Sequence, residues 1–331
     1  MQDFEGKRKS IYKGILFFGI LILLFAVVSA KSERALLNND WLVPARNRNS
    51  YRILREPEES IDIIVIGDSL SYSAISPLTL WKEQGYTSYV CGQSSQTIRE
   101  TEEMLAMALE RQTPSLIILE TDVLFRGPVG VKSLNDSIEA LLNYYIPVFR
   151  GHDAWKSVIV DKTEHAEDNY KGFAYRCTVK PYSKGEFMVK TKEKEPLSDT
   201  VLTHMENIIT LCQSHGAELV LLSTPSPVCY NYARHNALSE YAKEQKLTYL
   251  DLNLNTKAVG IDWQTDSFDQ GDHLNLSGAV KVTKYLGSFL SESYSLTDHR
   301  GEAAYVSWEK ESIIYEEKKE KDLAAMRRKD T

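Results

Sequence analysis

Short runs of apolar residues alternate along the chain with segments in which apolar residues recur at helical spacing. Five runs are short and continuous enough to predict buried strands, at 61–67, 87–91, 115–120, 217–223 and 247–252. Among the segments between them, 97–112 begins with the capping-box pattern of Thr97 and Glu100. Apolar strands separated by helices are typical of a parallel sheet that is covered on both faces. The pattern therefore predicts an α/β fold, a doubly wound three-layer α/β/α sandwich with a five-stranded parallel sheet.

One apolar run differs from the others because it is long and carries no charge, from Ile15 to Ala30. Four basic residues precede it, namely Lys7, Arg8, Lys9 and Lys13. By the positive-inside rule, residues 1–31 are expected to form a cytoplasmic basic segment and a single transmembrane anchor, with the following domain extracytoplasmic. The alternative is a cleaved signal peptide, since Val28 and Ala30 are the small residues that a signal peptidase favours.

The remainder of the chain divides by composition into three parts. Residues 32–60 are polar and rich in arginine, which predicts a stalk, and 61–293 form the α/β domain. Residues 294–331 are a charged tail, expected to be a solvated helix or disordered, with no chemistry to assign.

A long insertion, 123–198, separates the third and fourth predicted strands. It exceeds the connections usual in such folds and is rich in aromatic, basic and glycine residues, which predicts a lid or binding loop. An inert excursion is the alternative. We expect His152 and Trp155 to bind substrate and Lys171 to line an acceptor groove, although a packing role would explain each of them.

Charge and cysteine spacing restrict the ligands. The chain has a net charge of −7 and its basic residues are scattered, so no nucleic-acid partner is expected. The cysteines, at 91, 177, 212 and 229, lack the spacing of a metal site. The sequence therefore predicts neither a metal nor another cofactor.

Two polar stretches follow predicted strands at the edge of the sheet where ligands bind. The first strand ends in IGDSLSYSAISP, which places Ser69 on a strand-to-helix turn, either as a nucleophile or as a helix cap. The stretch SFDQGDHLNLSGA follows the fifth strand, and its His273 is the base that a serine nucleophile needs. Asp272 or Asp269 would orient the imidazole.

These motifs resemble the blocks of the SGNH (GDSL-type) hydrolase superfamily over about residues 60–293. The resemblance implies that Ser69 is the nucleophile, that His273 is the base, and that the N–H groups of Ser69 and Gly92 stabilise the oxyanion. The usual acid stands three residues before the histidine, where this chain has Gln270. Some membrane-anchored polysaccharide acetyltransferases of the superfamily place the acid closer to the histidine, so the resemblance slightly favours Asp272 over Asp269.

The chain also departs from the family at the third oxyanion donor. An asparagine usually supplies it after the third strand, where this chain has Asp122. A carboxylate there would oppose an oxyanion, so Asp122 must be protonated, turned away, or replaced as donor by Gln93 or Gln96.

The overall layout resembles the membrane-anchored alginate-type O-acetyltransferases and the D-alanyl-transfer proteins of teichoic-acid systems. The resemblance implies an O-acyltransferase that modifies a cell-envelope or secreted polysaccharide through a serine acyl-enzyme, with a multi-span membrane acyltransferase as partner. Two alternatives stay open: an esterase that deacylates glycans or lipids, and a catalytically weakened envelope-binding protein, which Asp122 suggests.

Overall fold

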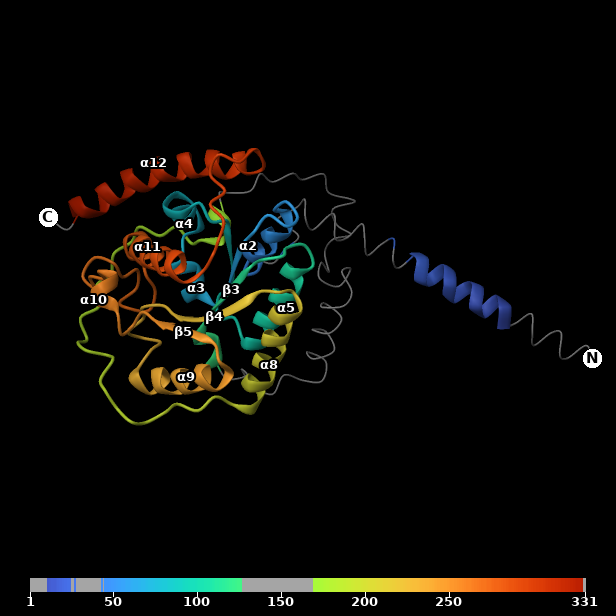
Figure 1. The fold of residues 1–331 in the computed structure, drawn as a ribbon, viewed down its shortest axis with the longest axis horizontal. Coiled ribbons are helices and arrows are strands. Elements are labelled where there is room, and N and C mark those ends of the chain that lie inside the picture. Colours follow the sequence, from blue (N-terminus) through green and yellow to red (C-terminus); the bar gives the residue numbers. More distant parts are fainter. Residues whose placement is uncertain (1–10, 25–26, 28–42, 44, 127–168, 330–331) are drawn as a thin grey trace, which may run out of the picture. The chain divides into compact units, whose positions relative to one another are not determined.

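The computed structural model describes residues 11–24, 27, 43, 45–126 and 169–329 (Figure 1). The chain divides into two compact units, one of residues 46–130 and 167–331 and the other of residues 1–45 and 131–166. The first of these contains the sheet and is described below.

In the other unit, the described residues include an apolar helical segment at 11–24 with exposed side chains. No helix within the described ranges is both long and apolar enough to cross a membrane. This finding contradicts the predicted transmembrane anchor at 15–30, and with it the prediction of a single-pass membrane protein.

The sheet is parallel throughout and confirms the predicted fold class. Its strands are β1 (Ile63–Gly67), β2 (Ser88–Gly92), β3 (Leu116–Glu120), β4 (Glu218–Ser223) and β5 (Thr248–Asp251). They lie in the order β2-β1-β3-β4-β5, so β1 and β3 are neighbours near the centre. The apolar runs predicted these strands because both faces of a parallel sheet are buried.

Helices cover both faces of the sheet, and alternate strand residues point to the two layers. One layer contains α3 (Ser69–Ala74), α4 (Pro77–Gln84) and α11 (Leu276–Ser293), which pack on Val65, Ile118 and Leu222 (Figure 1). The other contains α5 (Ile98–Leu109), α8 (Asp199–Ser214) and α9 (Tyr232–Gln245). Burial of both strand faces is the main source of stability for such a fold.

Short elements complete the described architecture. They are α2 (Arg48–Tyr51), α10 (Thr256–Val259) and the 3-10 turns η2 (Arg52–Arg55), η3 (Thr121–Leu124), η5 (Tyr170–Gly172) and η6 (Ala303–Tyr305). The described end of the predicted stalk packs on the domain, where Ser50 donates to the carbonyl of Gly92 at 2.8 Å.

The charged tail forms a long helix, α12 (Val306–Lys329), that packs on α4 (Figure 1). One stripe of it is buried, and this stripe includes Trp308 and Tyr315. Trp308 lies against Trp81 of α4 with ring centroids 5.4 Å apart, and the Tyr315 hydroxyl hydrogen-bonds Ser76 Oγ at 2.7 Å. The tail is therefore part of the folded domain, with charge on its exposed faces only.

Candidate active site

Ser69 lies where β1 turns into α3. The helix cap is the neighbouring Asp68, whose Oδ1 accepts the N–H of Leu70 at 2.9 Å. The Asp68 carbonyl accepts a further bond from Ser71 Oγ at 2.7 Å. A glycine is required at position 67 because an added Cβ would stand 2.6 Å from Glu120 Cβ. The capping alternative for Ser69 therefore does not hold, and its hydroxyl is available for another role.

His273 lies in the loop after β5, as the sequence predicted. The loop is closed by an antiparallel bridge between Ser267 and Leu274, and Phe268 donates its N–H to the carbonyl of His273 at 2.9 Å. Asn275 then caps α11 by accepting the N–H of Ser277 at 3.0 Å. The loop thus caps a helix and positions a histidine at the same time.

The stretch after β4 fixes this loop from the other side. Ser226 Oγ donates to the carbonyl of Asp272 at 2.8 Å, and the Ser226 N–H donates to Asn253 Oδ1 at 2.9 Å. The position of the imidazole therefore depends on the edges of β4 and β5 together.

Ser69, His273 and Asp269 form a continuous hydrogen-bonded series. His273 Nε2 is 2.8 Å from Ser69 Oγ, and His273 Nδ1 is 2.7 Å from Asp269 Oδ2. A carboxylate accepts the Nδ1 proton, which leaves Nε2 as the acceptor for the serine hydroxyl. This is the arrangement in which histidine acts as a general base toward serine.

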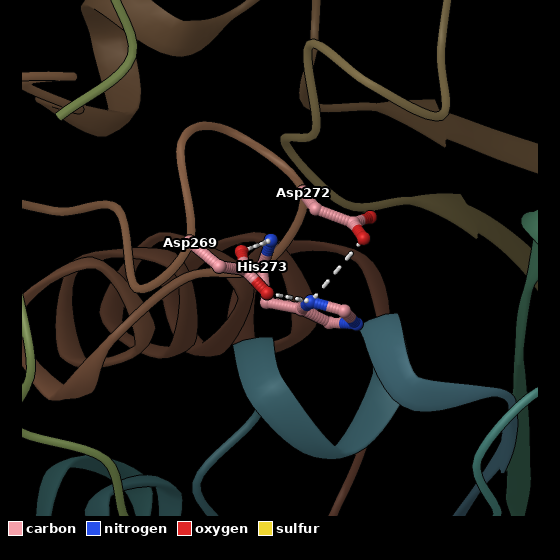
Figure 2. Close-up of side chains that lie close together, drawn as sticks. All are labelled: Asp269, Asp272 and His273. Atoms are coloured by element: carbon pink, nitrogen blue, oxygen red, sulfur yellow. Dashed lines mark hydrogen bonds and ion pairs between the residues drawn. The ribbon is translucent and has the colours of Figure 1, made fainter. Parts of the chain in front are cut away.

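Asp269 occupies the position of the triad acid, and the slight preference for Asp272 is wrong. Figure 2 shows both carboxylates beside the imidazole, but Asp272 Oδ2 is 3.6 Å from Nδ1, and its Oδ1 accepts from Cys229 Sγ at 3.3 Å. Asp269 Oδ1 also accepts the backbone N–H of His273 at 2.7 Å. The turn between them has positive φ at Gln270 (67°) and Gly271 (95°), which folds an acid four residues away back onto the histidine.

Asp269, Asp272 and His273 offer ligand atoms that lie within 4.8 Å of one another, as a metal site would. A metal at His273 Nδ1 would replace the proton that this nitrogen shares with Asp269. The hydrogen bond between Ser69 Oγ and Nε2 requires the proton of the imidazole to be on Nδ1. We therefore interpret His273 and Asp269 as parts of a triad with Ser69, and not as metal ligands.

The predicted oxyanion donors of the main chain lie at the same turn. Ser69 is the first residue of α3, so its N–H has no intrahelical acceptor. Gly92 pairs with Gly67 across the sheet, and a Cβ on Gly92 would stand 2.9 Å from the carbonyl of Asp68. The structure brings both residues to the nucleophile turn, and their role toward an oxyanion stays a prediction.

Asp122 is an acceptor in this structure, which contradicts its placement among the oxyanion donors. Its Oδ2 accepts from Arg126 Nε at 2.8 Å, and its Oδ1 accepts from Arg234 Nη1 at 3.0 Å. Of the proposed replacements, Gln96 already donates its amide to Thr101 at 2.9 Å. Two guanidinium groups thus neutralise the Asp122 carboxylate.

A buried group of carboxyls lies beneath the nucleophile turn. Glu120 and Asp68 are fully buried at the ends of β3 and β1, and Arg126 contacts both Asp68 and Asp122. Burial, with the nearby charge of Asp122, raises the pKa of Asp68 to about 7. Burial and the charges of Asp68 and Asp122 also raise the pKa of Glu120 well above its ordinary value.

Sequence reasoning missed Glu120, Arg126 and Arg234. Glu120 could have been found from its position, because it ends β3, the strand next to the one that leads into Asp68 and Ser69. The arginines carried no signal, because their pairing with Asp122 depends on where distant segments meet.

Of the three residues of the insertion that were predicted to contact substrate or acceptor, the structure describes only Lys171. His152 and Trp155 lie outside the described residues. The ammonium of Lys171 is buried and pairs with Glu56 at 3.0 Å and Glu311 at 3.1 Å, so it joins the stalk to α12 and does not line a groove.

Comparison with known proteins gives matches only among solved structures. Neither a protein-family model nor a curated protein sequence matches the chain. A GDSL-like lipase from Bacteroides thetaiotaomicron VPI-5482 is 12% identical, with a TM-score of 0.39 over 75% of this chain and 97% of that one. A lipase/acylhydrolase from Enterococcus faecalis is 11% identical, with a TM-score of 0.38 over 72% and 98% of the two chains. Similarity this distant does not establish an activity, and the functional argument therefore depends on the geometry of Ser69, His273 and Asp269.

Proposed function

We propose that this chain is a serine-dependent acyl hydrolase or acyltransferase that acts on oxygen esters. One observation supports the proposal above all: Ser69 Oγ, His273 Nε2, His273 Nδ1 and Asp269 Oδ2 are linked by hydrogen bonds of 2.8 and 2.7 Å. The series stands at the carboxyl edge of a parallel sheet, where α/β folds bind ligands.

The reaction follows from the roles of the three side chains. Ser69 Oγ attacks the ester carbonyl while its proton passes to His273 Nε2, and Asp269 stabilises the imidazolium through Nδ1. The N–H groups of Ser69 and Gly92 are expected to donate to the oxyanion of the tetrahedral intermediate. The alcohol then leaves with the proton from Nε2, and an acyl-serine remains. In the second half, His273 deprotonates water or an acceptor hydroxyl, which attacks the acyl group and releases Ser69.

Covalent labelling with a fluorophosphonate tests this proposal. The wild-type chain is expected to gain one adduct on Ser69, detected by mass spectrometry, and Ser69→Ala and His273→Ala are expected to gain none. The chain also offers a matched control. Ser239 Oγ is 3.4 Å from His235 Nε2, and His235 Nδ1 is 2.8 Å from Asp251, the last residue of β5. Unlike Ser69, however, Ser239 lies inside a helix, α9, and not at a strand-to-helix turn.

Ser239→Ala should therefore label like the wild type. Labelling that survives in Ser69→Ala, or that is lost in Ser239→Ala, would disprove the assignment of the nucleophile.

The finer proposal is that the acyl group passes to a sugar hydroxyl of a polysaccharide. It is supported by the sequence resemblance to O-acyltransferases, and an acyl-serine can pass its acyl group to a hydroxyl in place of water. With an acetyl ester and added xylo-oligosaccharide, a transferase yields acetylated sugar, whereas a hydrolase yields acetate alone. A multi-span membrane acyltransferase as partner stays a prediction from the resemblance.

A further inference from the structure

The return segment, residues 173–182, is attached to both parts of the triad. Ala174 donates its N–H to the carbonyl of Tyr72 in α3 at 2.8 Å. The carbonyl of Arg176 accepts the N–H of Leu276 at 2.7 Å, and Lys180 donates to the carbonyl of Ser267 at 2.9 Å. Arg176 is therefore held between the helix that begins with Ser69 and the loop that carries His273.

The side chain of Arg176 is oriented by two aromatic rings. Its guanidinium carbon is 4.6 Å from the centroid of Phe268 and 5.5 Å from that of Tyr72, and all three side chains are half-buried. Nη1 donates to Ser73 Oγ at 3.2 Å. A guanidinium that stacks on rings keeps its N–H groups in the plane available for a planar anion.

The catalytic residues lie near this guanidinium. Ser73 follows Ser69 by about one helical turn, and Phe268 directly precedes Asp269. One helical turn of about 5.4 Å separates Ser73 from Ser69, and the hydrogen bond from Arg176 to Ser73 Oγ adds 3.2 Å. The guanidinium therefore lies within roughly 10 Å of the nucleophile.

Arg176 has no ion-pair partner among the described residues. Six other arginines in the described part of the chain form ion pairs with carboxylates: Arg46, Arg99, Arg111, Arg126, Arg234 and Arg300. Within the same described ranges, no carboxylate lies within ion-pair distance of Arg176, whose one side-chain hydrogen bond goes to a neutral serine. Toward the described residues, Nε and Nη2 therefore keep their donor capacity for an anion.

We propose that Arg176 forms an anion subsite, and that the preferred substrate is an ester with a carboxylate group a few bonds from the reacting carbonyl. The inference depends on the proposed function, because it names the substrate class of the same site. It also has a physical reason: Asp269 and Asp272 beside His273 would repel an anionic substrate unless a cation offset them.

Matched pairs of chromogenic esters test the proposal and show which side of the ester bears the anion. Mono-4-nitrophenyl glutarate has a carboxylate on the acyl side, and its methyl-capped form is the neutral match. 4-Acetoxy-3-nitrobenzoate has a carboxylate on the leaving group, and its methyl ester is the neutral match. In at least one pair, the wild type should favour the anionic ester by about 10- to 100-fold in kcat/KM, as for a charge-assisted hydrogen bond.

The variants separate recognition from a structural role. Arg176→Gln should reduce this preference to about 1, and Arg176→Lys should retain part of it because it keeps the charge. Lys184→Gln is the matched control, since Lys184 is exposed just beyond the return segment and its loss changes the net charge equally. If Arg176 only held the segment to Ser73, Arg176→Gln would slow both members of each pair by the same factor.

Failure of this inference differs from failure of the proposed function. Ser69-dependent cleavage with no preference in either pair, or a preference that Arg176→Gln retains, would disprove the anion subsite alone. If no ester were cleaved and no Ser69 adduct formed, the proposed function would fail, and the subsite with it.

Discussion

Replacement of Asp269 by asparagine should disable the triad by changing the histidine tautomer. Asp269 accepts two hydrogen bonds, with Oδ1 from the backbone N–H of His273 and Oδ2 from Nδ1. The backbone N–H always donates, so an asparagine must turn its oxygen toward it and its NH2 toward Nδ1. Nδ1 then becomes an acceptor, the proton moves to Nε2, and His273 can no longer accept the proton of Ser69.

The size of the effect follows from this geometry. The corresponding change in a serine protease, which also leaves the wrong tautomer, costs about 10⁴ in kcat, and we expect a loss of about 10³ to 10⁴ here. Asp272 has no such contact. It acts on Nδ1 only through its charge, at 3.6 Å and with its side chain 37% exposed. In a water-like dielectric that interaction is about 1 kcal/mol, so Asp272→Asn should cost less than about tenfold.

Stopped-flow measurement of the acylation burst with a 4-nitrophenyl ester compares the two variants, with urea unfolding as the check that both remain folded. Equal losses in Asp269→Asn and Asp272→Asn would refute the reasoning. So would an Asp269→Asn variant that stays within tenfold of the wild type.

Two further predictions concern stability. The pKa of Asp68 is raised to about 7, so between about pH 4 and pH 7 the native state keeps a proton that the unfolded state releases. The free energy of unfolding therefore falls as pH rises through that range, by up to about 4 kcal/mol. Glu120, whose pKa is also raised, contributes a slope of the same sign. Asp68→Asn retains a helix cap and should therefore reduce the slope without abolishing it, as measured by urea unfolding at pH 5 and pH 8; an unchanged slope would assign it to other groups. In α12, Trp308→Ala should cost about 3 to 5 kcal/mol because it empties a buried ring site. Tyr315→Phe should cost about 1 kcal/mol because it removes the hydroxyl that hydrogen-bonds Ser76 and, at a longer distance, Thr79. A loss below 1 kcal/mol for Trp308→Ala in the same assay would show that α12 does not stabilise the domain.

The sheet and two members of the candidate site could be predicted from the sequence. Five continuous apolar runs predict buried parallel strands, and the carboxyl ends of such strands meet at one edge. Ser69 and His273 both follow strands directly, so their proximity follows from topology. No knowledge of side-chain contacts was needed.

The rest depended on conformations that have no pattern in the sequence. The choice of Asp269 over Asp272 follows from positive φ at Gln270, a residue that seldom adopts this conformation. The neutralisation of Asp122 requires Arg234 to approach from α9, and long-range ion pairs leave no periodic signal. In the tail, abundant charge obscured a narrow buried stripe that includes Trp308 and Tyr315.

The separation of the triad along the chain has a consequence for biosynthesis. Ser69 and His273 are 204 positions apart, and α12 can close over α4 only after residues 306–329 are made. Contacts of such high sequence separation form slowly, because a long loop must close before they contribute stability. The nascent chain is therefore inert while its first strands fold, and reactivity of Ser69 toward a fluorophosphonate would report completion of folding.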